Sequence, residues 1–151
     1  MAEKTGISWT TSTWNPVTGC DKISPGCKNC YAETFAERWR GIKEYEQGFD
    51  LKLWPERLSD PLKWKKPRRI FVNSMSDLFH DEVPFGFVSR VWDTMFDCPH
   101  HIFQILTKRP ERALTFAKHM ELSFRRFDYP NIWLGVSIEN ADYAFRADIL
   151  R

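Results

Sequence analysis

Three short apolar runs stand out in the pattern of hydrophobic and polar positions along this chain. They occupy residues 69–73, 102–106 and 131–136, and each follows a proline or a polar break. Their β-branched and aromatic composition is typical of buried strands. A further strand is expected at residues 7–10.

Helical spacing of apolar residues lies between and around these runs. Pro110 suits the first turn of a helix, and Tyr31, Phe35 and Trp39 mark one face of another. The predicted helices begin after Cys30, cover residues 84–96, run from Pro110 through Ala117, and cover residues 142–151.

Alternating strands and helices with nearly continuous apolar strands predict an α/β fold with a parallel sheet covered by helices. Four βα units do not close a barrel. We therefore expect parallel βα repeats that form a partial (β/α) barrel, an open sheet, or a layer completed by an oligomer. The chain reads as one α/β domain over residues 1–151, or as the N-terminal part of a longer barrel.

An insertion at residues 41–68 interrupts the alternation. Phe49, Leu51 and Leu53 alternate with polar residues as an edge strand does, and residues 55–64 predict one or two helical turns. The insertion runs into a basic cluster, KWKKPRR. This cluster is either a solvated lead-in to a strand or a phosphate-binding patch.

Composition and charge indicate the cellular location of the protein better than they indicate its binding partner. The chain has 151 residues and a net charge of +2, which by itself does not predict a polyanionic partner. No apolar run approaches the roughly 18 residues that span a bilayer, and the N-terminus lacks the apolar stretch of a signal peptide. We therefore expect a cytoplasmic protein without a membrane partner. Its four cysteines would stay reduced there, which favours metal binding over disulfides.

Three of those cysteines form a C-x6-C-x2-C motif, made of Cys20, Cys27 and Cys30. The loop is rich in Gly and Pro, follows a predicted strand and ends where a helix begins. A C-x2-C pair presents both sulfurs to one ion or cluster, and such a loop can fold back to bring in Cys20. The motif predicts a metal centre.

The odd number of thiols leaves the kind of metal centre open. A structural zinc site normally fills four positions, so three thiolates indicate an open position and favour an iron–sulfur cluster. Zinc is the alternative, with the fourth ligand drawn from His80, His100, His101 or Cys98, although a cysteine like Cys98 is more often a buried small hydrophobe. Plain thiols or a redox pair are the remaining interpretation.

Polar residues follow each of the three apolar runs. In a parallel sheet these positions share one edge, where ligands usually bind. Each residue alone is explained equally well as a cap or turn former, but recurrence at three strand ends favours function. The groups are Asn73, Ser74, Ser76 and Asp77; Thr107, Lys108 and Arg109; and Ser137, Glu139 and Asn140.

The three-cysteine loop after a first strand, followed by βα units, resembles the N-terminal part of radical S-adenosylmethionine (SAM) enzymes. More closely, the stretches TWNPVTGC, PGCKNCYAE, FVNSMSDLFH, QILTKRPER and WLGVSIEN resemble a phage-associated family of uncharacterised proteins related to that superfamily. The usual radical SAM motif is C-x3-C-x2-C with an aromatic residue before the last cysteine. Here six residues separate the first pair, and Asn29 precedes Cys30.

The resemblance implies a partial barrel of the radical SAM type, in which the three cysteines bind a [4Fe–4S] cluster. The fourth iron would chelate the amino and carboxylate groups of SAM, and an electron from a donor would cleave SAM to a 5′-deoxyadenosyl radical that acts on an unknown substrate. A phage-encoded protein would work in the host cytoplasm.

The resemblance also implies roles for the strand ends. Asn73, Ser76 and Asp77 would meet the methionyl amino group, and Ser137 and Glu139 would lie near the ribose. Lys108 would pair with a carboxylate or a substrate anion.

A zinc-binding module that contacts nucleic acid is the competing hypothesis. Trp9, Trp14, Trp54 and Trp64 lie near Lys and Arg in the sequence and could stack on bases. Such residues are more often part of a core.

Overall fold

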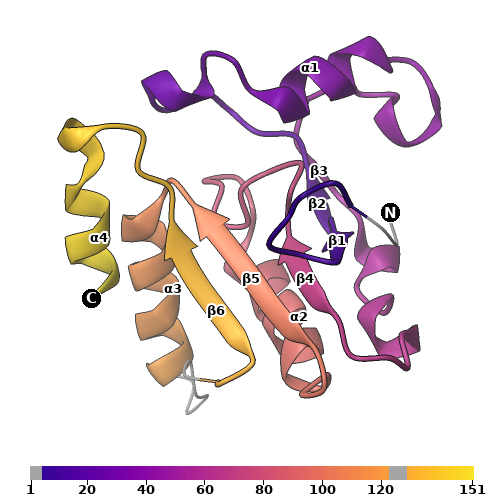
Figure 1. Ribbon diagram of the computed structural model, residues 1–151, viewed down its shortest axis with the longest axis vertical. Coiled ribbons are helices and arrows are strands. Elements are labelled where there is room, and N and C mark those ends of the chain that lie inside the picture. The colour runs from indigo at the N-terminus through magenta and orange to yellow at the C-terminus, as the bar shows by residue number, and fades with distance from the viewer. Residues whose placement is uncertain (1–4, 123–128) are drawn as a thin grey trace.

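A parallel sheet forms the centre of the computed structural model, which describes residues 5–122 and 129–151. Its strands are β1 (Ser12–Trp14), β4 (Arg69–Val72), β5 (Ile102–Thr107) and β6 (Ile132–Val136). They lie in the order β1-β4-β5-β6, and every neighbouring pair is parallel (Figure 1). The predicted α/β class with parallel βα units is confirmed, and the described strands form an open sheet.

Four α-helices alternate with or follow these strands: α1 (Tyr31–Arg38), α2 (Phe85–Phe96), α3 (Pro110–Leu122) and α4 (Phe145–Leu150). All four predicted helices are therefore confirmed in outline. The last one differs in detail, because a 3-10 turn at Ala141–Tyr143 precedes α4 and the Asn140 side chain accepts a hydrogen bond from the Asp142 N–H. No helix in the described part of the chain is long and apolar enough to cross a membrane.

The first strand lies later in the chain than predicted. Residues 7–10 form a turn, in which the Thr10 N–H donates to the Ile7 carbonyl across 3.3 Å. The hydroxyls of Thr10 and Thr11 both donate to the carbonyl of Arg69, at 2.8 and 2.9 Å, and pairing with β4 begins at Ser12. The Thr11 N–H donates to the same carbonyl across 2.9 Å, so the two threonines lead the chain into the strand.

The insertion contains the predicted edge strand and helical turns. β3 (Lys52–Leu53) pairs antiparallel with β2 (Val17–Thr18), and 3-10 turns follow at Pro55–Arg57 and Pro61–Lys63. The basic cluster leads into the start of β4. It therefore lies at the amino end of this strand, whereas the cysteine loop lies at the carboxyl end of the sheet. Its Arg68 guanidinium lies over the Trp64 ring, 4.7 Å from the centroid.

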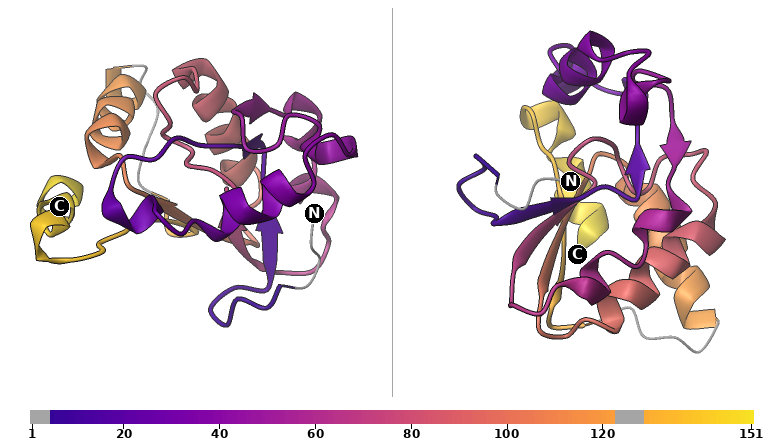
Figure 2. Two further views of the ribbon diagram at one scale, coloured as in Figure 1. Left: turned by 90° about the horizontal axis from the view of Figure 1, so that it is seen from above. Right: turned by 90° about the vertical axis from the view of Figure 1, so that its right-hand side faces the viewer.

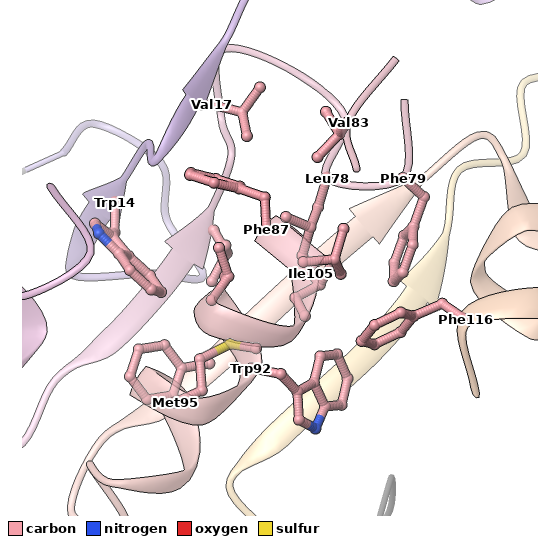
Figure 3. Packing of buried hydrophobic residues seen from close by; sticks show 14 of the residues in the cluster. Trp14, Val17, Leu78, Phe79, Val83, Phe87, Trp92, Met95, Ile105 and Phe116 are labelled. Atoms are coloured by element: carbon pink, nitrogen blue, oxygen red, sulfur yellow. The ribbon is translucent and has the colours of Figure 1, made fainter. Parts of the chain in front are cut away.

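The hydrophobic core lies between the sheet and helices α2 and α3, which cover the same face (Figure 2). Trp14 projects from β1 into this core, together with Ile105 from β5, Trp92 from α2 and Phe116 from α3 (Figure 3). β6 is the last strand of the described sheet, and its Trp133 is 52% exposed, so the prediction of a buried strand is wrong there. Edge strands lack a neighbour on one side, and this limits their burial.

Helix α1 stands apart from this core, above the carboxyl end of the sheet (Figure 2). It buries Ala32 and Ala36, whereas its aromatic stripe faces outward: Tyr31, Phe35 and Trp39 are 60, 45 and 43% exposed. An exposed stripe of three aromatic side chains is unusual for a helix that packs on a sheet.

Candidate functional site

The cysteine loop connects β2 to α1 across the carboxyl end of the sheet. Gly19 begins the loop with a φ of +84°, and a Cβ built there would lie 2.2 Å from the Asp50 carbonyl oxygen. Its N–H donates to the Met75 carbonyl across 3.0 Å, so the loop starts in contact with the segment after β4. Only glycine fits both the left-handed backbone and the close approach.

One cavity of about 390 Å³ brings together eight of the nine predicted site residues. The three motif thiols lie on its wall, with the polar side chains that follow the parallel strands. Those side chains arrive at one edge because parallel strands end on the same side. The predicted residues that line it are Cys20, Cys27, Cys30, Asn73, Ser76, Asp77, Lys108 and Ser137; Glu139 does not.

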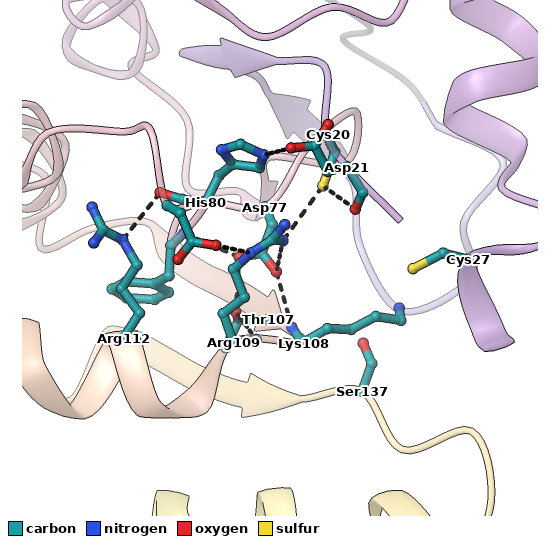
Figure 4. Close-up of polar contacts among 12 residues, drawn as sticks. Cys20, Asp21, Cys27, Asp77, His80, Thr107, Lys108, Arg109, Arg112 and Ser137 are labelled. Atoms are coloured by element: carbon teal, nitrogen blue, oxygen red, sulfur yellow. Dashed lines mark hydrogen bonds and ion pairs between the residues drawn. The ribbon is translucent and has the colours of Figure 1, made fainter. Parts of the chain in front are cut away.

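Asp77 is the centre of a hydrogen-bond network on one side of this cavity. Its Oδ1 accepts the Thr107 hydroxyl at 2.7 Å and the Phe79 N–H at 3.0 Å, and its Oδ2 accepts the Lys108 N–H at 2.9 Å. The Arg109 guanidinium lies 3.4 Å from the same Oδ2. This buried carboxylate therefore ties the end of β4 to the end of β5 (Figure 4).

Arg109 also reaches the first cysteine of the motif. Its Nη1 donates to the Cys20 Sγ across 3.6 Å, and the arginine is only 6% exposed. Burial raises the pKa of the Cys20 thiol, and the Arg109 charge and hydrogen bond offset part of that increase. The Cys20 thiol therefore ionises less readily than an ordinary cysteine, although a cationic donor lies beside its sulfur.

Cys27 has the opposite tendency. Partial burial opposes its ionisation, but hydrogen bonds from the backbone of Ile23 and from the Ser24 backbone and hydroxyl outweigh burial and lower the pKa of Cys27. Lys108 extends toward the side of the cavity where Cys27 and Ser137 lie, and its charge acts in the same direction (Figure 4). The two thiols therefore differ in their readiness to ionise.

Glu139 fastens the cysteine loop from outside the cavity. It accepts a hydrogen bond from the Ser24 hydroxyl, and its Oε2 lies 2.7 Å from the Nη1 of the buried Arg146. Gly26 permits the approach, since a Cβ there would lie 2.1 Å from the Glu139 Cγ. Burial works against ionisation, but Ser24 and Arg146 hold the pKa of Glu139 below its usual value.

Asn73 ends β4 in the left-handed conformation, with a φ of +58°. Asparagine adopts this region more readily than other non-glycine residues do. Its Oδ1 accepts the Val17 N–H at 3.5 Å, whereas its buried Nδ2 has no hydrogen-bond partner among the described residues. An unused buried amide donor in the wall of a cavity is rare in a folded protein.

Three of the four candidate fourth zinc ligands lie at the end of the sheet away from the cysteine loop. His100, His101 and Cys98 precede β5 and lie at its amino end, whereas the cysteine loop lies at the carboxyl end of a six-residue strand of roughly 20 Å. His80 lies near the loop, where its Nε2 is 3.1 Å from the Asp21 Oδ2 and its Nδ1 accepts the Glu82 N–H. Cys98 is buried in the main core, as expected of a small hydrophobe.

The three thiols do not converge on a single point. In the described residues, no group of three or more His, Cys, Asp or Glu side chains is arranged to hold one metal ion. A polynuclear cluster sets a different requirement, because each cysteine ligates its own iron atom.

Three contacts of the site were not predicted from the sequence. They are the bond from Arg109 to Cys20, the Ser24–Glu139 link, and the bond from the Tyr31 hydroxyl to the Ser74 carbonyl. Arg109 follows the end of a strand together with Lys108, and this position was the one sign in the sequence that Arg109 belongs to the site. The other two join residues that no local pattern connects.

The amino-acid sequence was compared with protein families, with curated proteins and with solved structures. The model of the family described as "Protein of unknown function (DUF5131)" matches residues 4–151. Among curated proteins no match was found. Among solved structures there was likewise no match. Because the family model spans almost the whole sequence, this chain belongs to the DUF5131 family.

Proposed function

We propose that this protein is an iron–sulfur enzyme of the radical SAM type, built on part of a (β/α) barrel. The supporting observation is the single cavity that gathers Cys20, Cys27 and Cys30 with the polar ends of three parallel strands. The substrate and the electron donor are unassigned. The cytoplasmic location and the phage association belong to this proposal and rest on the sequence patterns.

The residues present suit such a cluster. Three thiols on the wall of one cavity match three irons, and the fourth iron is left for a ligand other than protein. Asn73 and Lys108 both line this cavity, and Lys108 brings a positive charge to it. That charge suits the carboxylate of an amino acid.

When bound, the cluster would supply the electron that cleaves the S–C5′ bond of SAM, giving methionine and a 5′-deoxyadenosyl radical that acts on the substrate. The chain itself holds and orients the groups. Arg109 donates to Cys20 and stabilises its thiolate, Lys108 would pair with the anionic end of the cofactor, and Glu139 keeps the loop in place through Ser24.

Anaerobic reconstitution with iron and sulfide tests the proposal. We expect about four irons per chain, a visible absorption band that bleaches on reduction, and a change in the electron paramagnetic resonance spectrum on adding SAM. Replacing Cys20, Cys27 or Cys30 by Ala should abolish iron uptake. Cys98→Ala is the matched control, because Cys98 is a buried cysteine outside the cavity.

Two results would overturn the proposal. One is a lack of iron uptake in the wild type together with stoichiometric zinc, whose loss in His80→Ala would identify the zinc-module alternative. The other is a cluster whose spectrum ignores SAM, since an iron–sulfur protein without that response is not of this type.

A further inference from the structure

A second cavity lies beside the cysteine cavity and is larger, at about 720 Å³. Its lining includes Tyr31, Phe35 and Arg38 of α1, Thr13 of β1, and Ser74 and Met75, which follow β4. The insertion contributes Glu44, Tyr45 and Arg57 to its lining. Cavities of this volume are typical of small-molecule sites.

Aromatic rings supply much of its apolar surface. Phe35 and Tyr45 meet edge to face with centroids 5.4 Å apart, and Met75 also lines the cavity. Phe35 is 45% exposed although it lies in this wall, so its ring is available to a ligand. The cavity thus gives a role to Tyr31 and Phe35, two of the three exposed aromatic side chains of the stripe, whereas Trp39 does not line it.

The charge of the lining favours an anion. Its charged side chains are Arg38, Arg57 and Glu44, which give a net charge of +1. Glu44 lies 3.7 Å from the Arg57 Nη2, and Arg57 also donates to the Asn15 carbonyl and stacks on Trp54. Arg57 is therefore engaged within the fold and paired with Glu44. The positive charge of Arg38 remains available to a ligand in the cavity.

Tyr31 and Ser74 line both cavities, so the two share a wall. The Tyr31 hydroxyl donates to the Ser74 carbonyl and joins α1 to the segment after β4. A ligand in the larger cavity would therefore lie directly beside the one that contains the three thiols.

We propose that the larger cavity binds a small aromatic anion, with its ring against Phe35 and its carboxylate or phosphate at Arg38. Binding of this ligand does not depend on a metal. Its assignment as the substrate of the radical reaction rests on the proposed function.

Ligand-observed NMR and calorimetry on the purified chain, without added iron or SAM, test the site. The probes are adenosine monophosphate and 4-hydroxyphenylacetate, each compared with a neutral counterpart, adenosine and 4-hydroxyphenylethanol. At least one anion should bind more tightly than its neutral counterpart. The pair that shows this preference distinguishes a nucleotide from an aromatic carboxylate as the source of the anion.

Two variants assign the binding to this cavity. Arg38→Ala should weaken anion binding about two- to fivefold and leave the neutral compounds unchanged. Phe35→Ala should weaken both kinds of ligand about two- to tenfold. The controls are Lys118→Ala and Phe145→Ala, which replace one exposed cationic residue and one exposed aromatic residue that line neither cavity.

Three results would overturn the inference: no binding of either anion, equal binding of charged and neutral probes, or equal losses in the control variants. None of them bears on the cluster, which the iron and spectroscopic measurements test separately. Conversely, failure of iron uptake leaves the anion measurement intact, so the two proposals fail independently.

Discussion

The Nη1 of Arg109 donates a hydrogen bond to the Sγ of Cys20 across 3.6 Å, although 89 residues separate the two in the chain. A cationic donor at this distance stabilises a thiolate more than a thiol. Because the thiolate is the form that reacts and binds metal, Arg109 governs the chemistry of a residue from another part of the sequence.

Replacing Arg109 by Gln should therefore slow the alkylation of Cys20. The substitution removes the charge that offsets burial, so the pKa of Cys20 rises further and the thiolate population falls. We expect the rate with iodoacetamide at pH 8 to fall by a factor of about three or more, as measured by mass spectrometry of the cysteine peptides. Arg112→Gln is the matched control, since Arg112 contacts the carbonyls of His80 and Val83 instead of a cysteine. An unchanged rate in Arg109→Gln would exclude the effect.

In the wild type, Cys27 should react faster than Cys20. The pKa of Cys27 lies below the usual thiol value because hydrogen bonds from Ile23 and Ser24 outweigh burial, whereas burial raises that of Cys20. At pH 7.5 we expect Cys27 to be alkylated faster than Cys20, by a ratio well above the error of the measurement. The ratio should shrink toward high pH, where both thiols ionise. Equal rates at pH 7.5 would contradict the difference in ionisation.

Glu139→Gln should lower the free energy of unfolding at pH 7 by about 2–3 kcal/mol, because it leaves the buried Arg146 without its carboxylate. The folded-state pKa of Glu139 lies below the ordinary 4.5, so its contribution is complete above pH 4.5. That contribution disappears as the pH falls through the lowered folded-state value. Urea unfolding of both proteins from pH 7 downward should show the difference narrowing below pH 4.5.

The exposed pair Arg151–Asp148 provides the control for that measurement. Its side chains are 82 and 76% exposed, so Asp148→Asn should cost about 1 kcal/mol or less and show little change with pH. A pH-independent difference for Glu139→Gln would mean that the ion pair with Arg146 does not stabilise the fold.

Gly19→Ala should destabilise the protein by more than about 2 kcal/mol, because the added Cβ meets the Asp50 carbonyl and the backbone is left-handed. Gly86→Ala is the comparison, since a Cβ there has no atom within 4 Å and helical alanine is favoured over glycine. Thermal unfolding of the two variants should therefore show shifts of opposite sign. A tolerated Gly19→Ala would mean that the loop begins differently.

The sequence predicted the sheet and the gathering of polar residues at its carboxyl edge for one reason. The direction of strands in βα units determines where their ends meet, and periodicity is sufficient to recognise those units. Asp77, Lys108 and Ser137 follow different strands and line one cavity on that basis alone. The role of each of these residues depends on side-chain contacts, which the hydrophobic periodicity of the sequence does not predict.

The failures have physical causes. β1 was misplaced because its Ser12 and Thr13 are buried polar residues, which no apolar pattern detects. The aromatic face of α1 was predicted, but its exposure to solvent was not, because an apolar stripe on a helix ordinarily packs against the core. The Ser24–Glu139 link depends on folding of the whole chain, and a single sequence carries no local signal for it.

That link has a consequence for the order of events during protein synthesis. Ser24 and Glu139 are 115 residues apart, and at ordinary translation rates roughly 6–23 s pass between their incorporation. The thiols are therefore made long before the contact that holds their loop can form. The cysteine loop therefore takes its final shape only after the intervening strands and helices have been synthesised.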